Sequence, residues 1–270
     1  MIDLEKIYKS GQTFLWDKTV NWQGEPNYIV RSSVLWAVVE QNGEEYRIVK
    51  RTEMSPFWSE YFDDGTDYEE IVNMFPEGGI VGEALKVGRG LRILKQTPWD
   101  AAVQFVISQN NNIPKIKKSV DALARRFNGQ IVVFGRKYPA TLPVASEIIA
   151  AGPGALEGLG LGYRAKYLWN LAANWEKIEA QLCQEDTYEN HFKTLCGVYG
   201  IGPKVANCIC LFGLHDLDAV PVDVWMSRII ERAMGGMFPT NMSGAGVLQQ
   251  YLFYAVKNCP DFKERYLGED

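Results

Sequence analysis

The stretch LCGVYGIGPKVANCICLFGL, from Leu195 to Leu214, has the pattern of two helices joined by a tight Gly-Ile-Gly turn. Gly200 and Gly202 allow a hairpin whose backbone amides point outward, an arrangement that suits a phosphate group. Lys204 then falls in the first turn of the second helix. The sequence therefore predicts a helix-hairpin-helix over residues 188–214 that binds a phosphate backbone. An ordinary turn between two helices is the alternative.

A second stretch, VPVDVWM from Val220 to Met226, places Asp223 at the expected start of a third helix. Lys204 would stand at the positive end of its helix beside the apolar run VANCICLF, and both effects favour a free, nucleophilic amine. A carboxylate that caps a helix has a fixed orientation and can face a cationic transition state. We therefore interpret Lys204 and Asp223 as catalytic residues. The alternatives are a surface lysine and a plain helix cap.

The composition is that of a globular protein with a sizeable core: 270 residues, of which 47% are hydrophobic and 23% charged. A net charge of −5 weakly opposes a nucleic-acid partner, but basic residues gather between positions 115 and 137. Neither a membrane-spanning run nor a secretory signal is visible, so we expect a cytoplasmic protein without a membrane partner.

The cysteine and histidine content argues against metal clusters. The five cysteines lack paired Cys-x-x-Cys spacing, which favours reduced thiols. Only Cys259 follows Cys210, and this excludes an iron–sulfur cluster held by four closely spaced C-terminal cysteines. Two histidines offer little to a zinc ion.

The chain changes from β-type to helical patterns near Thr97. NYIVRS, VLWAVVEQ and EYRIVKR indicate strands, with Asn42-Gly43 as the turn between the last two. Thr97 is expected to cap a helix that begins at Pro98, and Pro114 to open the next. Residues 127–143 are interpreted as a loop. The fold class predicted is α+β, with an N-terminal antiparallel β domain over residues 1–96 and a larger α-helical domain over residues 97–270.

Taken together, the motifs resemble the 8-oxoguanine DNA glycosylase family of the helix-hairpin-helix superfamily, and we expect a bacterial member. The resemblance runs almost end to end, through SGQTFLW at 10–16, QFVISQNNNI at 104–113, LGLGYRAKY at 159–167, the hairpin, VPVDV and LQQYLF at 248–253. It implies a bifunctional glycosylase and lyase that flips 8-oxoguanine out of duplex DNA. Lys204 would displace the base and form a Schiff base, Asp223 would stabilise the oxocarbenium charge, and β-elimination would cut the strand.

The resemblance also implies roles for residues in two base-reading regions. On the lesion side, the Gly11 carbonyl would accept from N7–H of the oxidised base, Gln249 would read its Watson–Crick edge, and Phe253 and Cys208 would cover its two faces. Across the duplex, the residues expected to replace the flipped base and to bind the orphaned cytosine are Asn110, Lys115, Tyr163 and Arg164.

Two positions depart from the family pattern. Lys115 stands where eukaryotic members have arginine, and Trp225 stands where they have histidine. Because lysine lacks the planar fork of arginine, we expect only a modest preference for opposite cytosine. The resemblance requires no cofactor and allows a structural metal ion on the carbonyls of Cys196, Val198 and Ile201. It implies a monomer acting on damaged double-stranded DNA. A glycosylase for another damaged base and a non-catalytic DNA-binding module are the alternatives.

Overall fold

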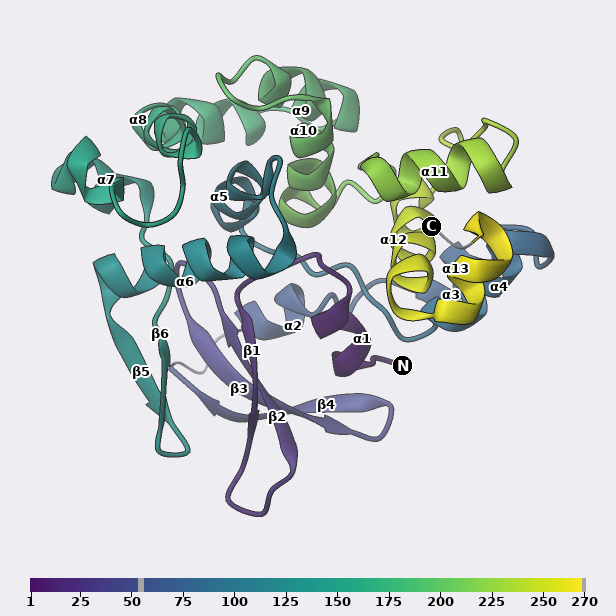
Figure 1. Cartoon of the computed structure of the whole chain (residues 1–270), viewed down its shortest axis with the longest axis horizontal. Coiled ribbons are helices and arrows are strands. Elements are labelled where there is room, and N and C mark those ends of the chain that lie inside the picture. The colour runs from purple at the N-terminus through teal and green to yellow at the C-terminus, as the bar shows by residue number, and fades with distance from the viewer. Residues whose placement is uncertain (53–55, 269–270) are drawn as a thin grey trace.

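The computed structural model describes residues 1–52 and 56–268. An antiparallel sheet lies at one end of the molecule and helices cover the rest (Figure 1), which confirms the predicted α+β class. The sheet has the order β1-β2-β3-β4, with strands Trp16–Val20, Pro26–Arg31, Trp36–Asn42 and Glu45–Arg51. The predicted domain division at residues 96 and 97 stays a prediction, and residues 53–55 and 269–270 of those domains lie outside the described residues.

The β3–β4 hairpin differs from expectation by one residue. Asn42 pairs with Glu45, so the two-residue turn consists of Gly43 and Glu44 rather than Asn42 and Gly43. Gly43 has φ 62°, the left-handed conformation that glycine adopts most easily and that hairpin turns require.

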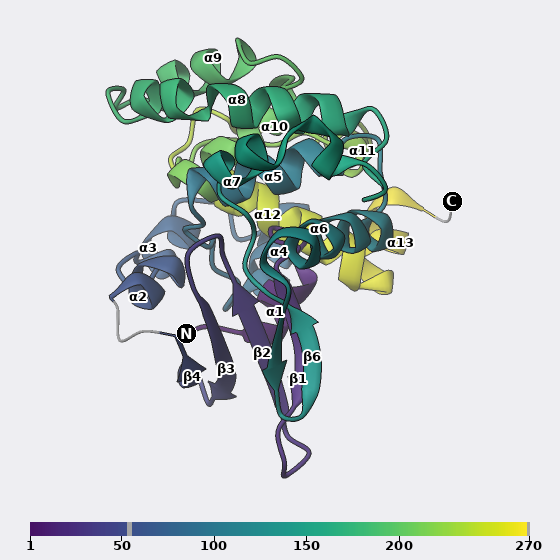
Figure 2. The same cartoon turned by 90° about the vertical axis from the view of Figure 1, so that its left-hand side faces the viewer.

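The interpretation of residues 127–143 as a loop is wrong. They contain a second hairpin, β5 (Gln130–Val133) and β6 (Arg136–Pro139), whose turn has positive φ at Phe134 and Gly135. The turn was concealed because phenylalanine rarely adopts this conformation. Val133 packs with Ile29 and Val38 on the face of the sheet that points away from the main core, and Figure 2 shows the hairpin alongside β1 and β2.

Helices make up most of the remaining chain. Thr97 caps α5 as predicted, accepting from the Asp100 amide at 3.0 Å. The helices are α1 (Leu4–Lys9), α2 (Phe57–Tyr61), α3 (Tyr68–Asn73), α4 (Gly79–Gly88), α5 (Pro98–Ser108), α6 (Ile113–Asn128), α7 (Ala145–Ala151), η1 (Pro153–Leu156), α8 (Arg164–Leu182), α9 (Tyr188–Cys196), α10 (Pro203–Ile209), the π-helical η2 (Cys210–Leu214), α11 (Val224–Ala233), α12 (Ala245–Asn258) and α13 (Pro260–Leu267).

The C-terminal helix α12 packs against α4 and α1 from the N-terminal part of the chain. Gly88 allows the close approach, because a methyl group there would lie 2.4 Å from the Tyr251 ring. The Tyr251 hydroxyl donates to the Leu91 carbonyl at 2.9 Å. The neighbouring residue Gln250 bonds the Ser10 carbonyl, so α12 also lies beside the loop that follows α1 (Figure 1).

Candidate active site

One small pocket gathers all the residues predicted for catalysis and lesion reading. It has a volume of about 60 Å³. Its walls come from the loop after α1 and from α5, α10, η2, the segment before α11, and α12. The lining residues are Ser10, Gly11, Phe105, Lys204, Cys208, Phe212, Pro221, Asp223, Gln249, Gln250 and Phe253. A larger hollow of about 690 Å³ lies by α3 and α4, away from Lys204 and Asp223.

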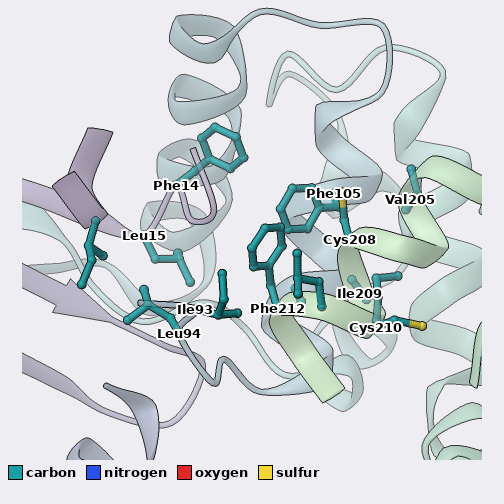
Figure 3. Packing of buried hydrophobic residues seen from close by; sticks show 14 of the residues in the cluster. Phe14, Leu15, Ile93, Leu94, Phe105, Val205, Cys208, Ile209, Cys210 and Phe212 are labelled. Carbon is teal, nitrogen blue, oxygen red and sulfur yellow. The ribbon is translucent and has the colours of Figure 1, made fainter. Parts of the chain in front are cut away.

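The Lys204 side chain projects from the first turn of α10 towards α5. Its Nζ atom lies 5.2 Å from the centre of the Phe105 ring, which stacks on Phe212 at 5.3 Å (Figure 3). Among the described residues Lys204 has no ion-pair partner, so no carboxylate holds its amine. Cys208 lies one helical turn further on. Burial raises the pKa of its thiol, while the charge and hydrogen bond of Lys204 oppose that change.

Asp223 is the N-cap of α11, as predicted. Its Oδ1 atom accepts from the amides of Trp225 and Met226 at 3.0 and 2.9 Å. These two bonds fix the carboxylate at the pocket wall. The pocket therefore holds an amine and an oriented carboxylate on separate helices.

Three of the residues predicted to read the lesion, Gly11, Gln249 and Phe253, line the pocket from the loop after α1 and from α12. Gly11 has φ 74°, and a methyl group there would lie 3.5 Å from Cε1 of Phe253. Gln249 is 4% exposed, and its Oε1 atom is buried without a hydrogen-bond partner in the described structure. Buried polar atoms are normally paired, so this acceptor is available for a ligand group.

Buried amides that the sequence analysis did not single out hold the Gly11 loop. Gln250 Nε2 donates to the Ser10 carbonyl at 2.8 Å, and Gln96 Nε2 donates to the Gln12 carbonyl at 2.7 Å. Gln12 Oε1 accepts from the Leu94 amide at 2.8 Å. Adjacent glutamines in the apolar run LQQYLF were a signal that could have directed attention to Gln250.

The three asparagines after α5 have different structural roles. Asn111 Nδ2 donates to the Ile107 carbonyl at 3.3 Å at the end of α5, and Asn112 caps α6 by accepting from the Lys115 amide at 3.0 Å. Asn110 is exposed in the left-handed conformation, with φ 45°. Lys115 is exposed in the first turn of α6. Asn110, on the loop after α5, and Lys115, on α6, are therefore exposed to solvent, and neither lines the pocket.

Arg164 is held by this loop rather than exposed. Its guanidinium donates to the carbonyls of Gln109 and Asn110, the latter at 2.8 Å, and it lies 4.7 Å from the centre of the Tyr163 ring. Tyr163 is half exposed, and its hydroxyl accepts from Asn110 Nδ2 at 3.2 Å. The structure thus brings Asn110, Tyr163 and Arg164 together.

The predicted helix-hairpin-helix spans α9, α10 and η2. Gly200 has φ 90°, and a methyl group there would lie 2.4 Å from the Tyr167 ring. The Gly200 carbonyl accepts from Gln109 Nε2 at 2.9 Å, which ties the hairpin to the Asn110 loop. Gly202 is exposed before α10. Tyr199, which the sequence analysis overlooked, is 56% exposed at the hairpin and contacts Tyr167.

Comparison with known proteins decides the family. Residues 1–101 match the family model described as 8-oxoguanine DNA glycosylase, N-terminal domain. The solved structure of MBOgg1 in complex with a low-affinity DNA ligand is 31% identical, with a TM-score of 0.81 over 94% of this chain and 91% of that chain. The chain belongs to the 8-oxoguanine DNA glycosylase family.

Two further relatives of this member of the 8-oxoguanine DNA glycosylase family are similar along most of the chain. The Clostridium acetobutylicum 8-oxoguanine glycosylase/lyase, solved with DNA containing cytosine opposite 8-oxoguanine, is 28% identical, with a TM-score of 0.79 over 95% of this chain and 92% of that one. The N-glycosylase/DNA lyase of Saccharomyces cerevisiae is 29% identical over 253 residues, which are 85% of this chain and 67% of the yeast protein. Relatives from a bacterium and a yeast do not confirm the predicted bacterial source.

Metal and membrane features of this family member can be stated for residues 1–52 and 56–268. They contain no group of three or more histidine, cysteine, aspartate or glutamate residues that could hold a metal ion. The Val198 carbonyl accepts from the Ile201 amide at 3.0 Å, which leaves it a second lone pair. No helix in these ranges is long and apolar enough to span a bilayer.

Proposed function

We propose that the chain is a bifunctional DNA glycosylase and lyase that excises 8-oxoguanine from duplex DNA and cuts the strand at the resulting site. The observation that carries the proposal is one pocket that combines Lys204 and Asp223 with the lesion-reading residues Gly11, Gln249 and Phe253. Family membership supports the same reaction, since the Clostridium acetobutylicum relative is named an 8-oxoguanine glycosylase/lyase.

Lys204 is the nucleophile in this proposal. Its amine forms a bond to C1′ of the flipped nucleotide, and the C1′–N9 bond breaks with its electron pair leaving on the base. Loss of a proton from nitrogen and opening of the sugar give a Schiff base. Removal of a proton from C2′ then expels the 3′ phosphate oxygen by β-elimination. Asp223, fixed by its helix cap, stabilises the positive charge that develops on the sugar.

Lesion discrimination depends on the part of the pocket formed by Gly11, Gln249 and Phe253. 8-Oxoguanine carries a hydrogen on N7 and guanine does not. The Gly11 carbonyl therefore gains a hydrogen bond from the lesion and faces a lone pair on the normal base, which costs free energy in a buried site. The unpartnered Gln249 Oε1 atom supplies an acceptor for the other edge of the base.

The pocket must widen when the base enters. A volume of about 60 Å³ is well below the ~300 Å³ at which ligand pockets begin. Phe253 is half-buried at the pocket wall beside Gly11, and its movement would open space for a stacked purine. We expect the Phe253 ring to move aside, the flipped base to enter the space it leaves, and the moved ring to stack on the base.

The opposite strand is proposed to contact the Asn110 loop. Asn110 offers an exposed amide, whose Nδ2 atom donates to the Tyr163 hydroxyl in the free protein, and Lys115 offers one ammonium from the first turn of α6. Arg164 reaches the cytosine only by exchanging its bonds to the carbonyls of Gln109 and Asn110 for bonds to the base. This arrangement supports a modest preference for cytosine rather than a strict one.

Borohydride trapping tests the function directly. The protein is incubated with duplexes that contain 8-oxoguanine or guanine at one position, together with sodium borohydride. A covalent adduct is expected with the lesion duplex only, and Lys204→Gln should bind that duplex without forming the adduct. Adducts on a different damaged base would favour a glycosylase of other specificity. Binding without adduct or base release by the unmodified protein would favour a non-catalytic module.

Two finer proposals concern assembly and ions. We expect a monomer in solution, which light scattering on the free protein tests. The carbonyls of Cys196, Val198 and Ile201 would suit a cation bound by oxygen ligands, since the hairpin offers neutral donors. Such a cation would steady the hairpin against a DNA phosphate and take no part in bond breaking.

A further inference from the structure

Three cationic side chains from three helices gather around Trp225. The Nζ atoms of Lys257 and Lys263 lie 4.8 and 5.2 Å from the centre of its ring, and Cζ of Arg228 lies 5.3 Å from it. An aromatic ring attracts cations, but the three like charges repel one another. An anion placed among them would offset the repulsion between the Lys257 and Lys263 ammonium groups.

The protein itself supplies little neutralisation for two of the three cations. Lys257 is exposed and Lys263 is half-buried. Neither forms an ion pair with a carboxylate in the described ranges of the chain. Their ammonium groups therefore present charge at the protein surface.

Two residues of the cluster lie close in sequence to residues that line the lesion pocket. Trp225 lies two residues after Asp223, and its amide donates to the Asp223 carboxylate at 3.0 Å. Lys257 lies one helical turn beyond Phe253 on α12, which itself lies one turn beyond Gln249. Helices α11, α12 and α13 contact one another, and Figure 1 shows them grouped on one side of the molecule.

We propose that Lys257, Lys263 and Arg228 bind one phosphate of the DNA backbone next to the flipped nucleotide. The proposal rests on the proposed function. A nucleotide rotated into the pocket leaves its phosphates outside the pocket, and the cluster lies close along α11 and α12 to Asp223 and Phe253, which line the pocket. Two ammonium groups act as point donors and the guanidinium offers a fork, a set suited to phosphate oxygens. Trp225 holds the three at one place.

The salt dependence of binding tests this assignment. Affinity for an 8-oxoguanine duplex is measured in the Lys204→Gln background between about 50 and 300 mM KCl, alone and with Lys257→Gln, Lys263→Gln or both. Because both lysines share one phosphate, the double variant should lose about 1 unit of the slope of log K against log [salt], not 2. It should also bind about tenfold more weakly at about 150 mM salt. Lys50→Gln is the matched control, since Lys50 is an exposed lysine 5.5 Å from the Trp36 ring on the sheet.

The outcomes separate this assignment from the proposed function. If the unmodified protein forms the borohydride adduct and the double variant keeps the parent slope, the cluster does not bind phosphate. A loss of slope with Lys50→Gln equal to that of the double variant would also overturn it. If the unmodified protein neither binds nor traps the lesion duplex, both the function and the cluster are rejected.

Discussion

Gln250 Nε2 donates a 2.8 Å hydrogen bond to the carbonyl of Ser10, the peptide that leads into Gly11. Both residues are buried, so the bond is shielded from water. Gln249 and Gln250 are consecutive on α12, and one faces the lesion space while the other holds the loop that reads the lesion. Two consecutive residues of α12 therefore position both parts of the recognition site, the Gln249 amide and the Gly11 loop.

Gln250→Met should weaken lesion selectivity without removing a group that touches the base. The variant keeps the side-chain length but leaves the Ser10 carbonyl unpaired, which frees the Gly11 loop to shift. Two quantities are measured: the single-turnover rate constant for excision of 8-oxoguanine and the association constant for a matched guanine duplex. The ratio of the first to the second should fall about tenfold. Gln184→Met, on the surface after α8, is the control. A melting change without any change in this ratio would make Gln250 purely structural.

Asp223→Asn should slow excision by about 10²–10³ while the protein still folds and binds DNA. Asparagine can accept the same amide bonds at the start of α11 but carries no charge for the sugar cation. Single-turnover rates with enzyme in excess measure the effect, and thermal melts confirm folding. An unchanged rate would remove Asp223 from the catalytic machinery.

Gln249→Leu should separate recognition from stability. Gln249 Oε1 is buried without a partner in the free protein, so replacing the amide by an apolar group should leave the melting temperature unchanged or raise it. Affinity for the lesion duplex should fall by about 1–3 kcal/mol because the base edge loses its partner. A large loss of stability would show instead that Gln249 is a structural residue.

Lys115→Arg should sharpen the choice of opposite base. A guanidinium can contact two acceptors in one plane, whereas the ammonium of Lys115 makes a single-point contact. Excision is measured on four duplexes that differ only in the base opposite 8-oxoguanine. An unchanged four-way ratio would assign discrimination to Asn110 and Arg164 instead.

The contribution of Asp100 to the free energy of unfolding should decrease as the pH rises from about 4 to 7. Burial raises the pKa of this carboxyl to about 7, although it accepts hydrogen bonds from Thr97 and Ser33. The folded protein then binds more protons than the unfolded chain between the ordinary pKa of 3.8 and about 7, so the free energy of unfolding decreases over that window and is level above it. Asp100→Asn should gain stability relative to the parent as pH rises from 5 to 8. A constant difference in melting temperature would contradict this.

Local signals predicted much of the fold. Thr97 and Asp223 cap helices as expected, because short polar side chains before apolar periodic runs have few other uses. The β5–β6 hairpin was missed because its turn uses Phe134 in a left-handed conformation, and β1 because WDKTV has weak β patterning. Tertiary packing decides both segments, because Val133 of β5 packs on the sheet and Trp16 of β1 is buried in the main core.

The site was predictable where a motif was local and not where it depends on contacts distant in sequence. Lys204, Asp223 and Phe253 lie in recognisable stretches, and the pocket collects them. The bond from Gln109 to Gly200 joins a loop to the hairpin across 91 residues, and the cations around Trp225 come from three helices. No spacing in a single sequence shows such contacts.

The closure of the chain on itself, through Ser10 and Gln250, separates holding DNA from acting on it. These residues are 240 positions apart, so the recognition wall exists only when α12 is docked on the N-terminal part. Local opening of α12 would leave the hairpin, Lys204 and the Asn110 loop in place. A molecule in that state would keep the contacts of the hairpin and the Asn110 loop to the duplex, would lose the phosphate contact proposed for Lys257, and would have neither Gln249 nor a fixed Gly11 loop to contact a base. Undocking of the whole helix thus makes the protein inactive, whereas losing the Ser10–Gln250 bond alone lowers its selectivity.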